Sequence, residues 1–136
     1  MKHTYVRRIY YGETDKMGVS YYANYFVWYE EARTELFRDI GYPYTEIEAK
    51  NIYLPVINAQ CRYFSPSTYD DLLTITTWVF LFEGVRLGFK YEVRKNDLDK
   101  LITTGETIHA FITEDKKKAI LPQELKLCIE NIIEKE

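Results

Sequence analysis

The feature that most constrains this chain is one long amphipathic helix that is followed by strand-forming sequence. From residue 22 onward large apolar residues recur every three or four positions, which is the spacing of one helix face. Gly41 and Pro43 end this pattern, so we predict a helix of about five turns over 22–40, with Ser20 or Asn24 as its N-cap. The apolar stripe consists of Tyr22, Tyr25, Phe26, Tyr29, Ala32, Leu36, Phe37 and Ile40, and the opposite face carries Glu30, Glu31, Arg33, Thr34, Glu35 and Arg38.

The rest of the chain reads mostly as strands. After a short helix or turn at 44–50, apolar side chains alternate with polar ones, which is the period of a strand with one buried face. We predict strands over 5–11, 53–63, 72–82, 85–93 and 101–113, and a terminal helix over 121–133 that has Pro122 near its start.

One long helix with about five antiparallel strands indicates an α+β fold. A curved sheet wrapped around the central helix is the economical way to cover its apolar stripe, although element order alone does not exclude other α+β folds. The length of 136 residues is enough for a buried core and predicts a single domain over 1–136.

Composition excludes several classes of function. The net charge of −3 argues against a nucleic-acid partner, and no apolar run is long enough for a transmembrane segment. The N-terminus lacks the apolar core of a signal peptide, so we expect a cytoplasmic protein with reduced Cys61 and Cys128. With only His3 and His109 as histidines, we expect no metal site, and we expect His109 to be a hydrogen-bonded structural residue.

Aromatic residues are unusually frequent, with thirteen tyrosines and seven phenylalanines. Aromatic side chains at this density often serve an interface or a ligand groove as well as a core. Trp28 lies off the main helix stripe, so we expect it to contact another subunit.

Asp15 is the strongest candidate for catalysis. It lies a few residues before the predicted helix, whose N-terminus offers unpaired N–H groups and partial positive charge. An ionised carboxylate suits a nucleophile or a general base, and the helix N-terminus can hold the oxyanion that forms when a carbonyl is attacked. The same Thr-Asp-x-x-Gly spacing also fits an ordinary turn. The nearby Glu13 is expected to face solvent.

The segment 10–26 resembles the signature of the 4-hydroxybenzoyl-CoA thioesterase family of hotdog-fold enzymes, in which an aspartate precedes the central helix. The segments 63–66 and 69–72 resemble the family's loop before its third strand. The resemblance implies a hotdog fold in which Asp15 attacks the thioester carbon or activates water. It maps the polarising backbone N–H onto Tyr22, a glycine that allows close substrate approach onto Gly18, and an asparagine that orients the loop or caps the helix onto Asn24.

The resemblance also implies an acyl-CoA thioesterase that needs no cofactor, because coenzyme A is part of the substrate. Arginine and lysine side chains would bind its phosphates, although each alone could be a solvated surface charge. The implied assembly is a homodimer or homotetramer with sites at the interface, and the donor is an acyl-CoA or an acyl carrier protein thioester. The basic candidates are Arg62, Arg86, Lys90, Lys116, Lys117 and Lys118.

Two residues depart from the pattern of the family, and two alternative functions remain. Many members of the family carry histidine where Tyr22 stands, and Arg86 occupies a position where a serine or threonine is seen. The first alternative is a non-catalytic module that binds acyl-CoA or acyl carrier protein, against which the intact Asp15 argues. The second is a hotdog dehydratase, which would need a histidine–aspartate pair that neither His3 nor His109 provides.

Overall fold

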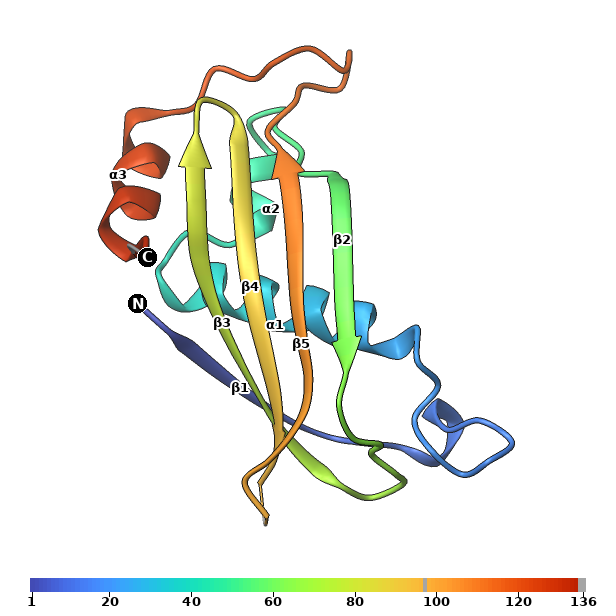
Figure 1. Ribbon diagram of the computed structural model, residues 1–136. Helices are drawn as coiled ribbons and strands as arrows, with labels where there is room; N and C mark the ends of the chain where they lie inside the picture. The colour runs from blue at the N-terminus through green and yellow to red at the C-terminus, as the bar shows by residue number, and fades with distance from the viewer. Residues whose placement is uncertain (97, 135–136) are drawn as a thin grey trace.

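The structure, a computed structural model, describes residues 1–96 and 98–134. Five antiparallel strands form one curved sheet in the order β1-β3-β4-β5-β2, and a single long helix, α1, crosses one face of it (Figure 1). The two edges of the sheet are therefore β1 and β2. The strands are β1 (His3–Arg8), β2 (Val56–Tyr63), β3 (Leu72–Glu83), β4 (Arg86–Lys95) and β5 (Lys100–Ala110). This arrangement confirms the predicted α+β class and the hotdog fold.

Alternation of side chains along the central strands explains how the sheet covers the helix. Along β4, Phe89, Tyr91 and Val93 are buried, whereas Lys90 and Glu92 between them are only partly buried and point to the other face. Strand β3 shows the same alternation, with Leu73 and Ile75 fully buried. One face of the sheet is thus apolar and faces α1, and the outer face carries polar side chains together with the aromatic Trp78 and Phe80.

Helix α1 (Asn24–Asp39) packs its apolar side against this face. Tyr29 and Leu36 are fully buried, and the Tyr29 ring stacks on Tyr91 with centroids 4.2 Å apart. The Tyr29 ring also lies against the backbone of β5 at Gly105, where a Cβ atom would come within 2.3 Å of the ring. Glycine is required at this point because any side chain would collide with the helix residue.

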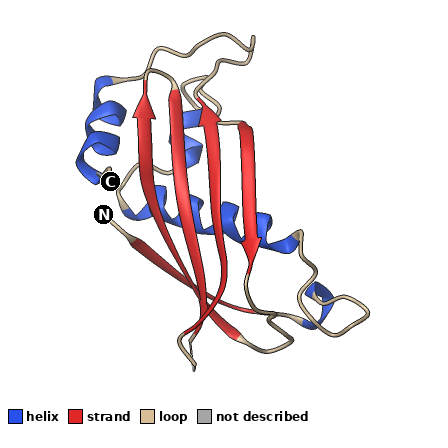
Figure 2. Ribbon diagram, viewed as in Figure 1, coloured by secondary structure: helices blue, strands red, loops and turns tan. Residues whose placement is uncertain are grey.

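Besides α1, the chain forms helices α2 and α3 and a short 3₁₀ helix, η1 (Figure 2). Helix α2 (Tyr44–Glu48) follows α1 in the chain, and the 3₁₀ helix η1 (Tyr11–Glu13) precedes α1. Helix α3 (Gln123–Ile132) lies within the predicted range 121–133, has Pro122 as its N-cap residue, and buries Leu125, Ile129 and Ile132 beside β3. None of the described helices combines the length and apolar character needed to cross a membrane.

The predicted N-terminal boundaries are partly wrong. Strand β1 ends at Arg8 and not at residue 11, and α1 begins at Asn24 and not at Tyr22. Ser20 does not cap the helix, because its hydroxyl is buried in a 2.7 Å hydrogen bond with Ser67. Asn24 does not cap it either, since Ala23 is the N-cap residue and makes no side-chain hydrogen bond. Tyr22 therefore lies before the helix and is 60% exposed.

Two predictions about the faces of α1 are also wrong. Trp28, expected at a subunit contact, is fully buried within the chain, where its indole N–H donates to Glu13 (3.1 Å) and its ring packs edge-on against Tyr25. Arg33, placed on the polar face, is only 9% exposed. The buried face of α1 is wider than a single stripe, because the curved sheet and the segment before the helix cover it from two sides.

Candidate active site

Asp15 lies in a tight turn that the backbone closes by itself. The Asp15 N–H donates to the Val19 carbonyl (2.8 Å), and the Gly18 N–H donates back to the Asp15 carbonyl (3.0 Å). Gly18 adopts φ +82°, a left-handed conformation that glycine accepts without strain. The sequence Asp-x-x-Gly therefore folds locally into a loop that presents the aspartate side chain at a fixed position.

Only one oxygen of the Asp15 carboxylate is hydrogen-bonded within this turn. Its Oδ1 accepts a hydrogen bond from the Met17 backbone N–H (2.8 Å). Its second oxygen, Oδ2, accepts none from residues 1–96 or 98–134. One carboxylate oxygen is thus held in place while the other is available to a substrate or a water molecule.

The segment between the turn and α1 leaves backbone donors free. Asn24 donates its side-chain Nδ2–H to the Glu13 carbonyl (2.8 Å), and the Tyr21 N–H donates to the same oxygen (2.9 Å). Asn24 therefore orients the loop, which was one of its two expected roles, and does not cap the helix. Within the described part of the chain, the backbone N–H groups of Tyr22 and Ala23 donate to no acceptor. These donors stand at the positive end of the helix dipole.

Asp15 and Tyr22 both line a pocket of about 370 Å³. The pocket brings together the Asp15 turn, the start of α1, the end of β2 and the loop that follows β2. The residues that line it are Asp15, Val19, Ser20, Tyr22, Tyr25, Tyr63, Phe64, Ser65 and Pro66. The sequence of 63–66 resembles a loop of the family but indicates no role for its residues. Nothing local shows that these residues lie beside Asp15, which is some fifty positions earlier in the chain.

Tyrosine hydroxyls fix the wall of this pocket. Tyr63 donates its hydroxyl to the Tyr22 carbonyl (3.0 Å), and the Tyr25 hydroxyl shares a 2.6 Å hydrogen bond with the buried Ser67. Burial, and then a hydrogen bond with Cys61, raises the pKa of Tyr63, so the phenol stays protonated and remains a donor. The wall is therefore neutral, and Asp15 is the carboxylate among the residues that line the pocket.

Glu13 is not the solvent-facing residue that was expected. Its carboxylate accepts hydrogen bonds from Arg7 (2.7 Å), the Tyr10 backbone N–H (2.8 Å) and Trp28 (3.1 Å). Burial alone would raise the pKa of Glu13, but these donors, led by Arg7, outweigh it and leave the pKa below its usual value. Its long-range partners on β1 and α1 turn Glu13 inward and make it an anchor for the loop.

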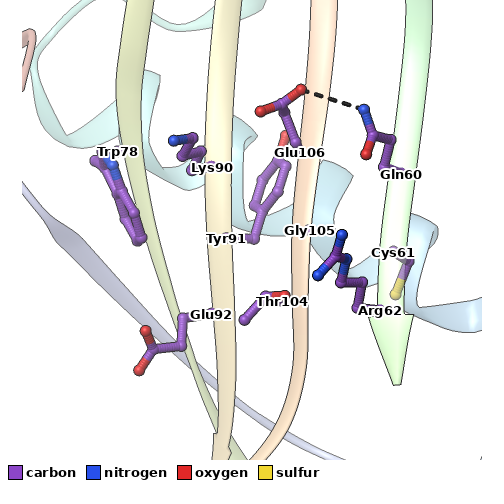
Figure 3. Close-up of a pocket in the computed structure, with 10 residues that line it drawn as sticks. All are labelled: Gln60, Cys61, Arg62, Trp78, Lys90, Tyr91, Glu92, Thr104, Gly105 and Glu106. Carbon is purple, nitrogen blue, oxygen red and sulfur yellow. Dashed lines mark hydrogen bonds between the residues drawn. The ribbon is translucent and has the colours of Figure 1, made fainter. Parts of the chain in front are cut away.

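The predicted phosphate-binding residues fall into two groups, and neither adjoins Asp15 within one chain. Arg62 and Lys90 lie on the outer face of the sheet, beside the hydrogen-bonded pair Gln60 and Glu106 (Figure 3). Their neighbours Cys61 and Tyr91 face the helix, where the Tyr29 hydroxyl contacts Cys61 and its ring stacks on Tyr91, so alternation turns Arg62 and Lys90 away from it.

The second group gathers at the far end of the sheet. Arg86 pairs in register with Ala110 near the start of β2, and Lys116, Lys117 and Lys118 lie in the loop beyond β5. Asp15 lies at the other end of β2, which is about 24 Å away for a strand of this length. Binding of a nucleotide by either group stays a prediction.

The remaining candidates agree with structural roles. His109 is fully buried and hydrogen-bonds the Leu54 carbonyl (3.1 Å) and the Thr107 hydroxyl (2.8 Å), as a structural histidine does. Cys61 and Cys128 are free and partly buried, as expected. Among residues 1–96 and 98–134, no three histidine, cysteine or acidic side chains are grouped as metal ligands would be.

Comparison with known proteins identifies the family of this chain. A family model described as the thioesterase-like superfamily matches residues 10–127, which is most of the chain. The chain belongs to the thioesterase-like superfamily. The matched range contains the Asp15 turn, α1 and all of the sheet except β1.

The similarity to individual members of the superfamily covers most of this chain. The acyl-CoA thioester hydrolase YbgC of Escherichia coli O157:H7 is 34% identical over 111 residues, which is 82% of each chain. Among solved structures, a DHNA-CoA thioesterase from Staphylococcus aureus superposes with a TM-score of 0.90 at 30% identity and covers 96% of this chain and 89% of its own. The 1,4-dihydroxy-2-naphthoyl-CoA thioesterase Slr0204 from Synechocystis has a TM-score of 0.88 at 25% identity and covers 96% and 97%.

Proposed function

We propose that this chain hydrolyses acyl-CoA thioesters, giving the free acid and coenzyme A. The observation that carries the proposal is a pocket lined by both Asp15, whose Oδ2 is free, and Tyr22, whose N–H donates to no acceptor in the described residues. Relatives named as acyl-CoA and DHNA-CoA thioesterases support the choice of substrate class.

In the proposed reaction the thioester carbonyl oxygen accepts a hydrogen bond from the Tyr22 N–H, which stabilises the oxyanion that forms on attack. As a nucleophile, Asp15 attacks the carbonyl carbon, the C–S bond breaks, the thiolate of coenzyme A takes a proton, and water cleaves the resulting anhydride. As a general base, Asp15 instead takes a proton from the water that attacks the carbon. Either route needs only water as co-reactant, so we propose no metal or cofactor.

We further propose that two copies pair through β2. Strand β2 is an edge of the sheet, pairs with β5 alone among the described strands, and is exposed along nearly all of its length, including Val56 and Ile57. Antiparallel pairing of two β2 strands would extend the sheet to ten strands. It would also set the start of β2 in one protomer against the end of β2 in its partner, and so bring the Arg86 end of one chain to the Asp15 end of the other.

The test of the activity is an assay of thiol release from acyl-CoA with Asp15→Asn. Asparagine keeps the shape of the side chain but loses the charge, so we expect turnover to fall by at least about 10²–10⁴-fold with the fold unchanged. Asp70→Asn is the matched control, because Asp70 is exposed and its φ of +71° suits asparagine equally well. Unchanged turnover in Asp15→Asn would remove Asp15 from the mechanism.

The same assay separates the proposal from its main rival, a module that binds acyl-CoA or acyl carrier protein without turnover. Binding of acyl-CoA without thiol release by the wild-type chain would favour the binding module. Release that is unaffected by EDTA would agree with a reaction that uses no metal.

A further inference from the structure

A second pocket lies along the same helix, between α1 and β2. It has a volume of about 200 Å³, and its apolar wall includes Phe26, Val56 and Ala59. This is too small for a nucleotide and is suited to a short organic group. Its polar lining comes from Arg33 of α1 and Thr107 of β5, with the exposed Glu30 at the rim.

Arg33 is a buried cation whose charge is not balanced within the chain. It is 9% exposed, it donates a long hydrogen bond to the Tyr91 hydroxyl (3.3 Å), and the neutral phenol of the buried Tyr44 also interacts with it. A guanidinium carries five N–H donors, so most of them are unused. No carboxylate of residues 1–96 or 98–134 lies within 4.0 Å of it, and Glu30, one turn earlier on α1, forms no ion pair with it. A buried charge without a counter-charge is costly, which makes this position favourable for an anion.

Apart from the exposed Glu30 at the rim, the groups beside Arg33 are neutral, and Tyr91 holds it in place. Tyr91 is stacked on Tyr29, and its hydroxyl shares a 2.6 Å hydrogen bond with Thr107. Thr107 in turn hydrogen-bonds His109. Burial, with a smaller contribution from the Arg33 charge, lowers the pKa of His109 to about 4, so this imidazole is neutral at physiological pH. None of these groups supplies the negative charge that Arg33 lacks.

We propose that this pocket receives the far end of the acyl group and that this end carries a carboxylate, which pairs with the Arg33 guanidinium. The inference rests on the proposed thioesterase function and names its substrate class: acyl-CoA esters of dicarboxylic acids. In the proposed dimer, the two β2 strands are antiparallel, so Val56 at the start of β2 in one protomer lies opposite the end of β2 in its partner. The Arg33 pocket of one chain would then adjoin the Asp15 pocket of the other, and the carbon chain of the substrate would span the two along the apolar wall.

The test compares two substrates of equal chain length, adipoyl-CoA with a terminal carboxylate and hexanoyl-CoA with a terminal methyl group. For the wild-type protein we expect kcat/KM to be higher for adipoyl-CoA by roughly 10- to 100-fold, as a charge-assisted hydrogen-bonded pair provides. In Arg33→Met this preference should disappear or reverse, while hexanoyl-CoA is still hydrolysed. Arg38→Met, which removes an exposed arginine from the same helix, should keep the preference.

The ratio between two substrates distinguishes substrate contact from a structural role, because a general loss of folded protein lowers both rates together. The wild-type preference needs no variant and remains decisive if Arg33→Met does not fold. Equal or better hydrolysis of hexanoyl-CoA by the wild type would overturn the inference and leave the thioesterase function intact, as would a preference that survives Arg33→Met. Hydrolysis of neither ester, nor of any other acyl-CoA, would overturn both.

Discussion

The Tyr63 hydroxyl donates a 3.0 Å hydrogen bond to the backbone carbonyl of Tyr22, and this bond ties the end of β2 to the residue whose N–H we assign to the oxyanion. The donor group of the candidate site is thereby fixed by a residue that lies about forty positions later in the chain. The geometry of the Asp15 site therefore depends on the sheet edge as well as on the local turn.

Gly105→Ala should destabilise the fold. A Cβ at this position would lie 2.3 Å from the Tyr29 ring, which cannot move away because it stacks on Tyr91 and hydrogen-bonds Thr103 (2.6 Å). We expect the free energy of unfolding to fall by about 1–3 kcal/mol, measured by urea denaturation. Gly12→Ala is the matched control, since nothing lies within 4 Å of its Cβ position, and its stability should be unchanged or slightly higher. Equal effects of the two substitutions would contradict the close approach at Gly105.

Stability should decrease as the pH falls from about 6.5 to about 4. Burial lowers the pKa of His109 to about 4 from an ordinary value of 6.5, so in this window the unfolded chain takes up a proton that the folded chain does not. Proton uptake by the unfolded state lowers the free energy of unfolding, here by up to about 3 kcal/mol at the acid end. Above pH 6.5 this contribution to stability is fully present.

His109→Asn separates this effect from other titrations. Asparagine can place a donor near the Leu54 carbonyl but does not titrate, so the variant should lose less stability than the wild type between pH 6.5 and 4. Urea unfolding at several pH values measures the difference. Parallel stability curves for the two proteins would show that His109 is not the group responsible.

Binding of CoA esters should weaken with salt, because exposed charges are screened over about 10 Å at 0.1 M ionic strength. Arg86→Ala and the combined replacement of Lys116, Lys117 and Lys118 by alanine should each raise KM and leave kcat nearly unchanged, since phosphate contacts are equal in the ground and transition states. A truncated thioester without the nucleotide should not respond to either variant. Unaltered KM with full CoA esters would place the nucleotide elsewhere or favour a carrier-protein donor.

Ile57→Asp should shift the protein from dimer to monomer. Ile57 is 56% exposed on the open edge strand, and two copies of a charge brought together by a symmetric β2 pair would repel. Light scattering should give a mass near 16 kDa for the variant and about twice that for the wild type. Leu127→Asp, on the exposed side of α3, is the matched control and should leave the mass unchanged. A monomeric wild-type protein would rule out the β2 interface.

The sequence was sufficient for features that depend on neighbouring residues. The period of three to four over 22–40 and the alternation in the later segments predicted α1 and the four long strands, because each pattern is local. The Asp15 turn could be predicted for the same reason, since Asp15, Gly18 and Tyr22 are close in the chain. The sequence also indicated a structural role for His109, because this residue stands between apolar neighbours in a strand.

Features that depend on distant partners could not be predicted. Glu13 is drawn inward by Arg7 and Trp28, and the burial of Arg33 follows from the curvature of the sheet over α1, none of which leaves a periodic signal. The separation of Arg62 and Lys90 from Asp15 depends on where β2 and β4 stand in the sheet and on which of its faces α1 covers, and neither is local information.

The exposed edge of strand β2 links the assembly of the protein to its risk of aggregation. A newly folded chain with this edge unpaired offers a row of backbone N–H and C=O groups beside Val56 and Ile57, and such edges recruit foreign strands into aggregates. Pairing with a second copy would close the edge before this occurs, so a low concentration of the chain in a cell would be a hazard as well as a loss of active sites. A substitution that weakens pairing without adding a charge should therefore appear as insoluble protein, whereas Ile57→Asp should give a soluble monomer.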